Sequence, residues 1–204
     1  FKWLSAQNIN IGLAPCSAMR VNFVGELGWE LHHPIEYQNH IFDQLMEAGK
    51  EFGLKPYGIR AMNSLRVEKS YKLVGTELSI EYSPYESGLD RFVHPNKGDF
   101  IGRAALDKWR AKGFSNKLVT MEIHGVTDAD VLGNNPIYDN GSVVGRATSG
   151  DFGFRLNKSI ALGMVKPELA KVGQKLKIDI LGKMHEASIV EESPYDSENK
   201  LLRA

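Results

Sequence analysis

Cysteine is nearly absent from the sequence, and neither sign of charge is in excess. Cys16 is the single cysteine of the 204 residues, so an intramolecular disulfide, a dithiol redox pair and a cysteine zinc site are all excluded. Lysine plus arginine total 25, and so do aspartate plus glutamate. A chain without a basic field is not expected to bind nucleic acid or an anionic membrane surface. A reducing compartment is expected.

Long apolar runs and nucleotide-binding motifs are missing too. The longest uncharged stretch, residues 3–19, is broken by polar residues, glycine and proline, so it predicts neither a membrane span nor a signal sequence. No glycine-rich dinucleotide fingerprint and no P-loop occur. His32, His33 and His40 match no zinc spacing, so no metal site is expected.

What remains is an ordinary globular composition, with 42% hydrophobic and 25% charged residues. Residues 18–23 and 29–33 predict a β-hairpin around a glycine-rich turn. Apolar residues at helical spacing predict a helix over residues 36–52 and a second one over 56–70, with Ile59, Met62 and Leu65 on its apolar side. A third helix is predicted over residues 100–112, with Asp99 capping its N-terminus.

The pattern changes near Gly113. Short apolar runs are then separated by glycine, proline, asparagine and aspartate, with expected turns at Asn140-Gly141 and Leu181-Gly182. The predicted strands are 118–123, 141–147, 159–165, 175–180 and 185–190. Such spacing favours a small antiparallel β-barrel or sandwich. The sequence therefore predicts an α+β fold with two domains, residues 1–112 and 113–204.

The predicted hairpin carries two carboxylates and an aromatic ring around its glycine turn. Glu26, Gly28, Trp29 and Glu30 lie within five residues. A carboxylate can accept two parallel hydrogen bonds from an amidine-like edge, as on a pterin, while a ring covers the face of the ligand. Glu30 is the candidate for this role. The alternative is that both glutamates simply decorate an exposed hairpin.

The second predicted helix combines an N-terminal anion preference with two arginines. Its first-turn amides and Arg60 both favour an anion, although a plain surface role for Arg60 is equally compatible. Arg66 falls on the apolar side, where a charge must be paired. Glu26, Glu68 or another internal carboxylate would be its partner.

Five motifs in one order resemble the folate-binding aminomethyltransferase family, which includes the glycine cleavage T-protein and the C-terminal half of dimethylglycine and sarcosine dehydrogenases. The resemblance covers about residues 18–195, and the dehydrogenase members are the most similar. The motifs are Gly25-Glu-Leu-Gly-Trp-Glu30, Gly58-Ile-Arg60 with Asn63-Ser-Leu-Arg-Val-Glu68, Glu86-Ser-Gly-Leu89, Lys97-Gly-Asp-Phe-Ile-Gly102 and Val144-Gly-Arg-Ala-Thr-Ser-Gly150. Glu86–Leu89 and Val144–Gly150 are expected to be turns and strand pairings that shape the domains.

The resemblance implies a tetrahydrofolate pocket. Glu30 would bind the pterin with Trp29, Gly28 and Glu26 beside it, Arg60 would face the anionic tail, and Tyr195 is the nearest match to a family tyrosine that approaches folate. The family's catalytic aspartate would lie upstream of Phe1, so no catalytic residue is assigned here. A chain that begins without methionine is accordingly expected to be part of a longer protein.

The expected function is capture of a methyl-derived carbon as 5,10-methylenetetrahydrofolate, in a dimethylglycine or sarcosine dehydrogenase-like parent that oxidises a small N-methyl amine with FAD. One alternative is part of an aminomethyltransferase that receives its carbon from a lipoyl-linked carrier protein. Another is a folate-binding module without turnover. The expected compartment is the bacterial cytoplasm, with the mitochondrial matrix as the alternative.

Overall fold

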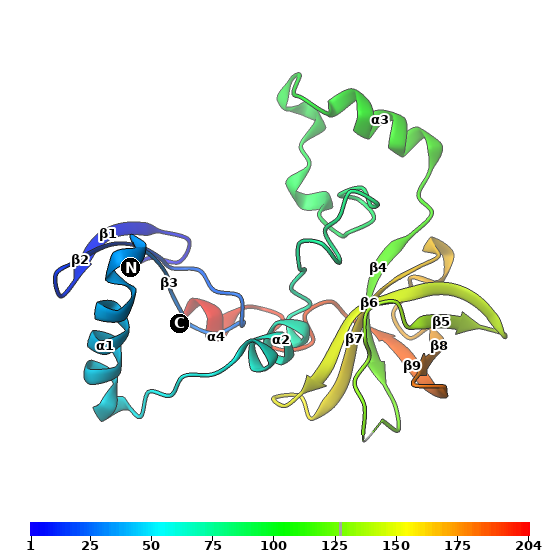
Figure 1. Ribbon diagram of the computed structural model, residues 1–204. Coiled ribbons are helices and arrows are strands. Elements are labelled where there is room, and N and C mark those ends of the chain that lie inside the picture. Colours follow the sequence, from blue (N-terminus) through cyan, green and yellow to red (C-terminus); the bar gives the residue numbers. More distant parts are fainter. Residues whose placement is uncertain (127) are drawn as a thin grey trace. The chain divides into compact units, whose positions relative to one another are not determined.

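The computed structural model describes residues 1–126 and 128–204, which form two compact units. Unit 1 contains Phe1–Met62 together with Glu198–Ala204, and unit 2 contains Asn63–Ser197. Figure 1 shows the elements of both. The mixture of helices with an antiparallel barrel confirms the α+β class. The domain boundary expected near Gly113 stays a prediction.

Unit 1 is built on a three-stranded antiparallel sheet in the order β1-β2-β3. Its strands are β1 (Ala6–Ile11), β2 (Ala14–Met19) and β3 (Glu30–His32). Along β2, Ala14, Cys16 and Ala18 are buried, while the residues between them are not. This two-residue period gives the sheet one packed face and one open face.

The predicted hairpin is only partly right. Its two strands pair, with Ser17 opposite His32, but β2 ends at Met19 instead of continuing to residue 23, and β1 was not predicted. The strand stops because the side chain of Asn22 accepts the backbone N–H groups of Val24 and Gly25 at 3.0 and 2.8 Å. Such a local turn competes with strand pairing for the backbone hydrogen-bonding groups.

The predicted helix over residues 36–52 is confirmed. It consists of a 3₁₀ turn η1 (Ile35–Tyr37), α1 (Gln38–Gly49) and a second 3₁₀ turn η2 (Lys50–Phe52). Gly53 ends it with φ 70°, the left-handed conformation that glycine adopts without strain. The last element of unit 1 is α4 (Lys200–Arg203), which buries Leu202.

Helix α2 (Ile59–Glu68) begins in unit 1 and ends in unit 2. It exists as predicted, and Arg66, which the spacing places on the apolar side, is buried. Of the apolar residues expected on that side, Ile59 is 76% exposed, and Met62 and Leu65 are only half-buried. The rest of the buried surface at this end of the helix includes polar groups that bond to other parts of unit 2.

Unit 2 contains a closed antiparallel barrel in the order β4-β7-β6-β5-β8-β9, visible on the right of Figure 1. The strands are β4 (Lys117–Ile123), β5 (Pro136–Asp139), β6 (Ser142–Gly153), β7 (Lys158–Val165), β8 (Lys175–Ile180) and β9 (Lys183–Val190). The five predicted strands are confirmed, although β6 is longer than expected and the short β5 was missed. A proline start and four residues give β5 almost no alternation to detect.

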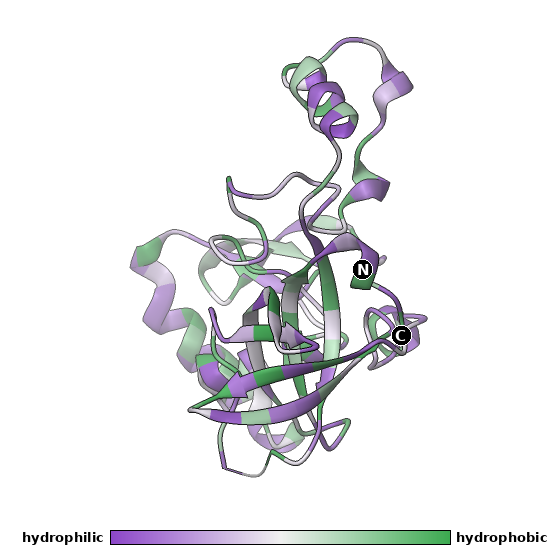
Figure 2. Cartoon of the chain, turned by 90° about the vertical axis from the view of Figure 1, so that its right-hand side faces the viewer, coloured by the Kyte–Doolittle hydropathy of each residue, from purple (hydrophilic) through white to green (hydrophobic). Residues whose placement is uncertain are grey.

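The barrel core follows from alternation along its strands. In β8, Leu176, Ile178 and Ile180 are buried and the residues between them are exposed or half-buried. Figure 2 shows the corresponding change of hydropathy along the barrel strands. Both expected tight turns are confirmed, because Asn140-Gly141 has φ 47° and 80° and Leu181-Gly182 has φ 51° and 80°.

The structure also describes four further elements after α2 and outside the barrel strands of unit 2. They are η3 (Asp90–Phe92), η4 (Pro95–Lys97), α3 (Arg103–Lys112) and η5 (Pro167–Leu169). The predicted cap at Asp99 is wrong, because α3 begins three residues later than expected. Gly102 holds the N-cap position with φ 95°, and no side chain caps the helix. Among the described residues, no helix has the length and apolar character needed to cross a membrane.

The packing of β6 against β7 makes a testable prediction at Gly145. A Cβ at this residue would lie 2.2 Å from the carbonyl oxygen of Met164. Because a backbone atom cannot move aside cheaply, Gly145→Ala is expected to lower the free energy of unfolding by about 1–3 kcal/mol in urea denaturation. Gly58→Ala is the control, since a Cβ there meets nothing within 4 Å. Equal effects of the two substitutions would contradict the packing argument.

Candidate functional site

The segment between β2 and β3 is shaped by Asn22. Besides accepting two backbone N–H groups, its side-chain amide donates to the carbonyl oxygen of Glu26. Gly28 lies against it, because a Cβ there would be 3.2 Å from the Cβ of Asn22. Asn22 was missed as a site-shaping residue, although an asparagine three residues before a glycine is a recognisable turn signal.

Glu30 is the first residue of β3 and lies on the open face of the sheet. Its side chain is 46% exposed, and one carboxylate oxygen is 3.5 Å from Nε2 of His32. Because side chains two apart on a strand share a face, the pair follows directly from the sequence spacing. His32 entered the sequence analysis only as a rejected metal ligand, and its relation to Glu30 was missed.

Trp29 stands beside Glu30 with 45% of its surface exposed. Its ring meets Phe1 edge to face at 6.1 Å, and the guanidinium of Arg20 lies 6.0 Å from the ring centre. Arg20 is buried and donates to the carbonyl oxygens of Phe1, at 2.7 Å, and of Ala204. The ring thus contacts Phe1 and Arg20 while a large part of it stays open to solvent.

The six predicted site residues fall in both units. Glu26, Gly28, Trp29 and Glu30 share one segment of unit 1, and Glu26 is half-buried there. Arg60 is exposed in the first turn of α2, also in unit 1, and none of the described residues forms an ion pair with it.

Tyr195 belongs to unit 2. Its backbone N–H donates to the carbonyl oxygen of Glu68 at 3.1 Å, and the guanidinium of Arg155 lies 3.8 Å from its ring centre. The carbonyl oxygen of Tyr195 accepts from the buried Lys69 at 3.1 Å. These contacts attach the segment that follows the last barrel strand, at Tyr195, to the C-terminal end of α2.

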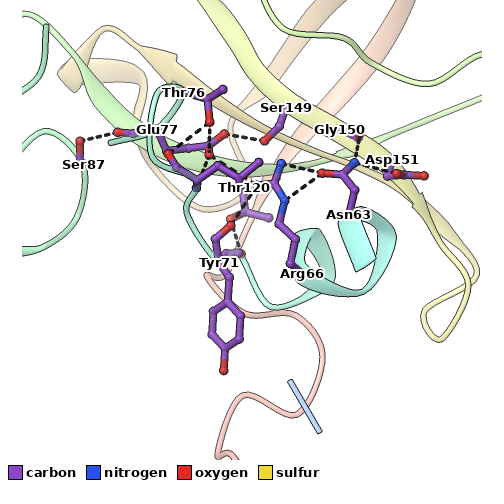
Figure 3. Close-up of polar contacts among 12 residues, drawn as sticks. Asn63, Arg66, Tyr71, Thr76, Glu77, Ser87, Thr120, Ser149, Gly150 and Asp151 are labelled. Atoms are coloured by element: carbon purple, nitrogen blue, oxygen red, sulfur yellow. Dashed lines mark hydrogen bonds and ion pairs between the residues drawn. The ribbon is translucent and has the colours of Figure 1, made fainter. Parts of the chain in front are cut away.

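A second polar cluster, drawn in Figure 3, lies inside unit 2 around Arg66. Nε and Nη2 of Arg66 donate to Oδ1 of Asn63 at 2.9 and 2.8 Å, and Nη1 donates to the carbonyl oxygen of Tyr71 at 2.9 Å. The same Nη1 is 3.4 Å from Oε2 of Glu77. The expected internal carboxylate is therefore Glu77, while Glu68 pairs with Arg155.

Glu77 is fully buried and remains charged. It accepts the backbone N–H of Leu73 at 2.8 Å, the hydroxyl of Thr76 at 2.7 Å and the hydroxyl of Ser149. Burial by itself would raise the pKa of Glu77, but hydrogen bonds led by the one from Ser149 hold that pKa below its ordinary value. Burial lowers the pKa of Arg66, against the opposing charge of Glu77, and an arginine keeps its proton all the same.

Helix α2 is bound to β6 through its polar side. Nδ2 of Asn63 donates to Oδ2 of Asp151 at 2.7 Å and to the carbonyl oxygen of Gly150 at 3.2 Å. The hydroxyl of Ser64 donates to the carbonyl oxygen of Phe152 at 2.6 Å. The motif at residues 144–150 therefore shapes a strand that receives the helix.

Glu86 has a comparable structural role. It is 3% exposed, and Oε2 accepts the backbone N–H and the hydroxyl of Ser83 at 3.0 and 2.9 Å. Oε1 accepts the backbone N–H groups of Ser115 and Asn116 at 3.3 and 3.1 Å. The motif at residues 86–89 thus closes a turn and ties it to the entry of the barrel, as expected.

Two family models match the chain. Residues 1–97 match the GCVT N-terminal domain, and residues 116–196 match the glycine cleavage T-protein C-terminal barrel domain. The chain is 40% identical over 193 residues to mitochondrial dimethylglycine dehydrogenase of Homo sapiens, covering 94% of this chain and 22% of the relative. It is 36% identical over 175 residues to aminomethyltransferase of Desulfitobacterium hafniense, covering 86% of this chain and 47% of the relative.

A solved structure has the same fold. Glycine cleavage system aminomethyltransferase T from Bartonella henselae matches with a TM-score of 0.85 and 22% identity, covering 97% of this chain and 54% of that chain. The chain therefore spans about half the length of these aminomethyltransferases and about a fifth of the human dehydrogenase.

The Arg66–Glu77 pair predicts a pH-dependent loss of stability. At pH 7, Glu77→Gln is expected to cost about 3–5 kcal/mol of unfolding free energy, because it leaves the buried charge of Arg66 uncompensated. The pKa of Glu77 is lowered by folding, so its stabilisation is complete above the unfolded carboxyl value of about 4.3 and is lost as the pH falls through the lowered folded value.

Urea denaturation at several pH values checks this prediction. The difference between the parent protein and Glu77→Gln should shrink steadily on acidification. Glu186→Gln is the matched control, because Glu186 forms an exposed ion pair with Lys177 and should change the stability by less than about 0.5 kcal/mol. A difference that does not vary with pH would show that folding leaves the pKa of Glu77 unchanged, and a difference that grows on acidification would show that folding raises it.

Proposed function

The chain belongs to the glycine cleavage T-protein family, and from this membership we propose that it is the tetrahydrofolate-binding, one-carbon-transfer region of a dimethylglycine or sarcosine dehydrogenase-like enzyme. The observation that carries the proposal is Glu30, whose carboxylate stands half-exposed on an open sheet face beside the exposed ring of Trp29. This pairing of an acceptor with an aromatic surface fits a flat ligand that has an amidine edge.

The chemistry of a reduced pterin matches this arrangement. Its ring N–H and neighbouring amino group are parallel donors, and a carboxylate accepts two parallel hydrogen bonds. Trp29 supplies apolar surface for the ring at low entropic cost. Gly28 and Glu26 complete the segment, and Gly28 lets the backbone lie close to Asn22. Glu30 is thus the proposed pterin anchor.

Arg60 is the proposed contact for the anionic tail of the folate. Two features support it, the exposed guanidinium and the position in the first turn of α2, where backbone N–H groups favour negative charge. Tyr195 is proposed as a further folate contact from unit 2, on the strength of the family resemblance alone.

In the parent enzyme, FAD would supply the oxidation of the N-methyl amine. The residues of this chain would bind reduced folate so that the oxidised one-carbon unit is captured as 5,10-methylenetetrahydrofolate before water hydrolyses it. Holding the two reactants together replaces a bimolecular encounter, which is the main rate contribution expected of this region.

A second candidate is one half of an aminomethyltransferase that accepts carbon from a lipoyl-linked carrier. It is supported by the 36% identity over 175 residues to a protein of that name. The two candidates differ in the carbon donor. If the full-length protein forms methylenetetrahydrofolate from dimethylglycine or sarcosine, the first candidate is favoured. If it forms this product only from an aminomethylated lipoyl carrier, the second is favoured. The human relative is named mitochondrial. A bacterial cytoplasm stays our expectation for this chain.

Glu30→Gln tests the anchor. The variant retains the shape but loses the charge that receives the pterin donors, and hydrogen bonds to charged groups are worth about 1.5–3 kcal/mol. Calorimetric titration of the natural full-length protein with 5-formyltetrahydrofolate should therefore give an affinity about ten- to a hundredfold weaker. Glu36→Gln, an exposed glutamate of unit 1, is the control. Unchanged affinity in Glu30→Gln would remove the anchor role.

Arg60→Gln tests the tail contact. An exposed charge pair contributes about 0.2–1 kcal/mol, so binding of the reduced folate should weaken up to about fivefold and lose part of its salt dependence. Binding of 6-methyltetrahydropterin, which lacks the tail, should not change. Lys55→Gln, at an exposed cation before α2, is the control. Equal weakening for both ligands would contradict the assignment.

A further inference from the structure

The outer surface of the barrel in unit 2 carries a cluster of charged and nucleophilic side chains. In the strand register, Ser188 of β9 lies opposite Glu122 of β4 on one side and opposite Lys175 of β8 on the other. Ala187 and Ile189, the neighbours of Ser188 along β9, belong to the barrel core, so Ser188 points outward. Directly opposed residues share a face, and strand pairing therefore gathers these three polar side chains on one surface.

The hydroxyl of Ser188 bonds to two basic groups. Its Oγ lies 2.7 Å from Nε2 of His124, the residue that follows β4, and 2.7 Å from Nζ of Lys175. A lysine ammonium can only donate, so it occupies a lone pair of Oγ and leaves the serine proton free to be donated to Nε2 of a neutral imidazole. This is the geometry of a nucleophile beside its general base, with a cation next to the oxygen that would develop negative charge.

The imidazole has a carboxylate on its other side. Nδ1 of His124 lies 3.8 Å from Oε1 of Glu122, an ion-pair distance, and the other oxygen of Glu122 accepts from Lys158 at 2.8 Å. The backbone N–H of His124 donates to the carbonyl oxygen of Glu186 at 2.8 Å, which holds the residue beside β9. The charged residues around the imidazole are Glu122 of β4, Lys158 of β7, Lys175 of β8 and Glu186 of β9. Serine, histidine and glutamate thus stand in the arrangement of nucleophile, base and carboxylate that defines a hydrolytic triad.

Access to the hydroxyl limits the size of a substrate. Ser188 is 8% exposed, whereas Lys175 and His124, which bond to its hydroxyl, are themselves exposed. A lysine ammonium sits on a flexible four-carbon stem, so movement of Lys175 uncovers the serine oxygen without a change of the barrel backbone. The site therefore suits a small electrophile.

We propose that Ser188 is an activated hydroxyl that accepts an acyl group from a small carboxylic ester with a good leaving group. Its Oγ attacks the carbonyl carbon and forms a new C–O bond, and its proton passes to Nε2 of His124. The bond from that carbon to the leaving oxygen then breaks, and the leaving group departs with the proton that His124 returns. Water that gives a proton to the same imidazole hydrolyses the acyl-serine to the free acid. Lys175 stabilises the charge on the serine oxygen, and Glu122 is a positioning residue that faces the imidazolium.

Covalent trapping in the natural full-length protein tests the proposal. Diisopropyl fluorophosphate transfers its phosphoryl group to an activated serine with loss of fluoride, and peptide mass spectrometry should locate the adduct at Ser188. The protein should also release nitrophenolate from 4-nitrophenyl acetate, and Ser188→Ala should abolish most of that release. Ser142→Ala, at an exposed serine of β6, is the matched control and should change neither result.

The base and its carboxylate are tested by rate. General base catalysis contributes about a hundredfold or more, so His124→Gln should slow trapping at Ser188 by that factor. In the unmodified protein, trapping should accelerate as the pH rises through about 5 to 8, the range in which histidine loses its charge. Glu122→Gln should move the midpoint of this profile to lower pH, because the imidazolium loses the opposite charge that faces it. An unchanged midpoint would remove the positioning role of Glu122.

Trapping reads the unmodified protein, so its result does not depend on whether a variant folds. Failure to find the adduct on Ser188 would overturn the proposal, and so would nitrophenolate release by Ser188→Ala at the unmodified rate. Trapping at Ser188 that His124→Gln leaves equally fast would overturn the role of the imidazole as base. Thermal unfolding verifies that each variant is folded before its rate is measured.

Discussion

The buried ion pair between Arg66 and Glu77 is the constraint on which much of unit 2 depends. Both side chains are almost fully removed from water, and two charges are tolerated there only when their remaining donors and acceptors are satisfied. Asn63 and the backbone of residues 71–73 meet that requirement. The pair therefore fixes three things at once, the end of α2, the loop that follows it, and Ser149 of β6.

The same principle extends along the end of α2. Glu68 receives the backbone N–H groups of Arg155 and Leu156 at 2.8 and 3.0 Å, which closes the turn between β6 and β7. Lys69 donates to the carbonyl oxygens of Tyr195 and Asp196 at 3.1 and 2.7 Å. The end of this helix therefore packs against the barrel through polar side chains. Each of these side chains bonds to a protein group in place of the water it loses on burial.

Local signals account for what could be predicted from the sequence. The helix over residues 36–52, the turn at Asn140-Gly141 and most barrel strands follow from periodicity and turn chemistry within a few neighbouring residues. Helical spacing places Arg66 on the buried side of α2, but its partner Glu77 could not be found in this way, because the two side chains meet only through the fold of the loop between them and of Ser149 on β6. The same limit hid β1, which is recognised as a strand only through its pairing with β2.

Burial then separates the family motifs into two physical classes. Arg66 and Glu86 have their hydrogen-bonding groups committed to internal partners, so a ligand could reach them only by breaking the fold. Glu30, by contrast, has a half-exposed carboxylate that lies 3.5 Å from Nε2 of the exposed His32.

The choice of Glu30 as the candidate site follows from this difference in exposure. A group on an open sheet face can exchange water for a ligand at small cost, whereas a satisfied buried group cannot. The sequence already separates Glu30 from Arg66, since Glu30 stands in a predicted hairpin turn and Arg66 on the apolar side of a predicted helix. Exposure and hydrogen-bond satisfaction separate them in the same way, because Glu30 stays accessible to a ligand and Arg66 does not.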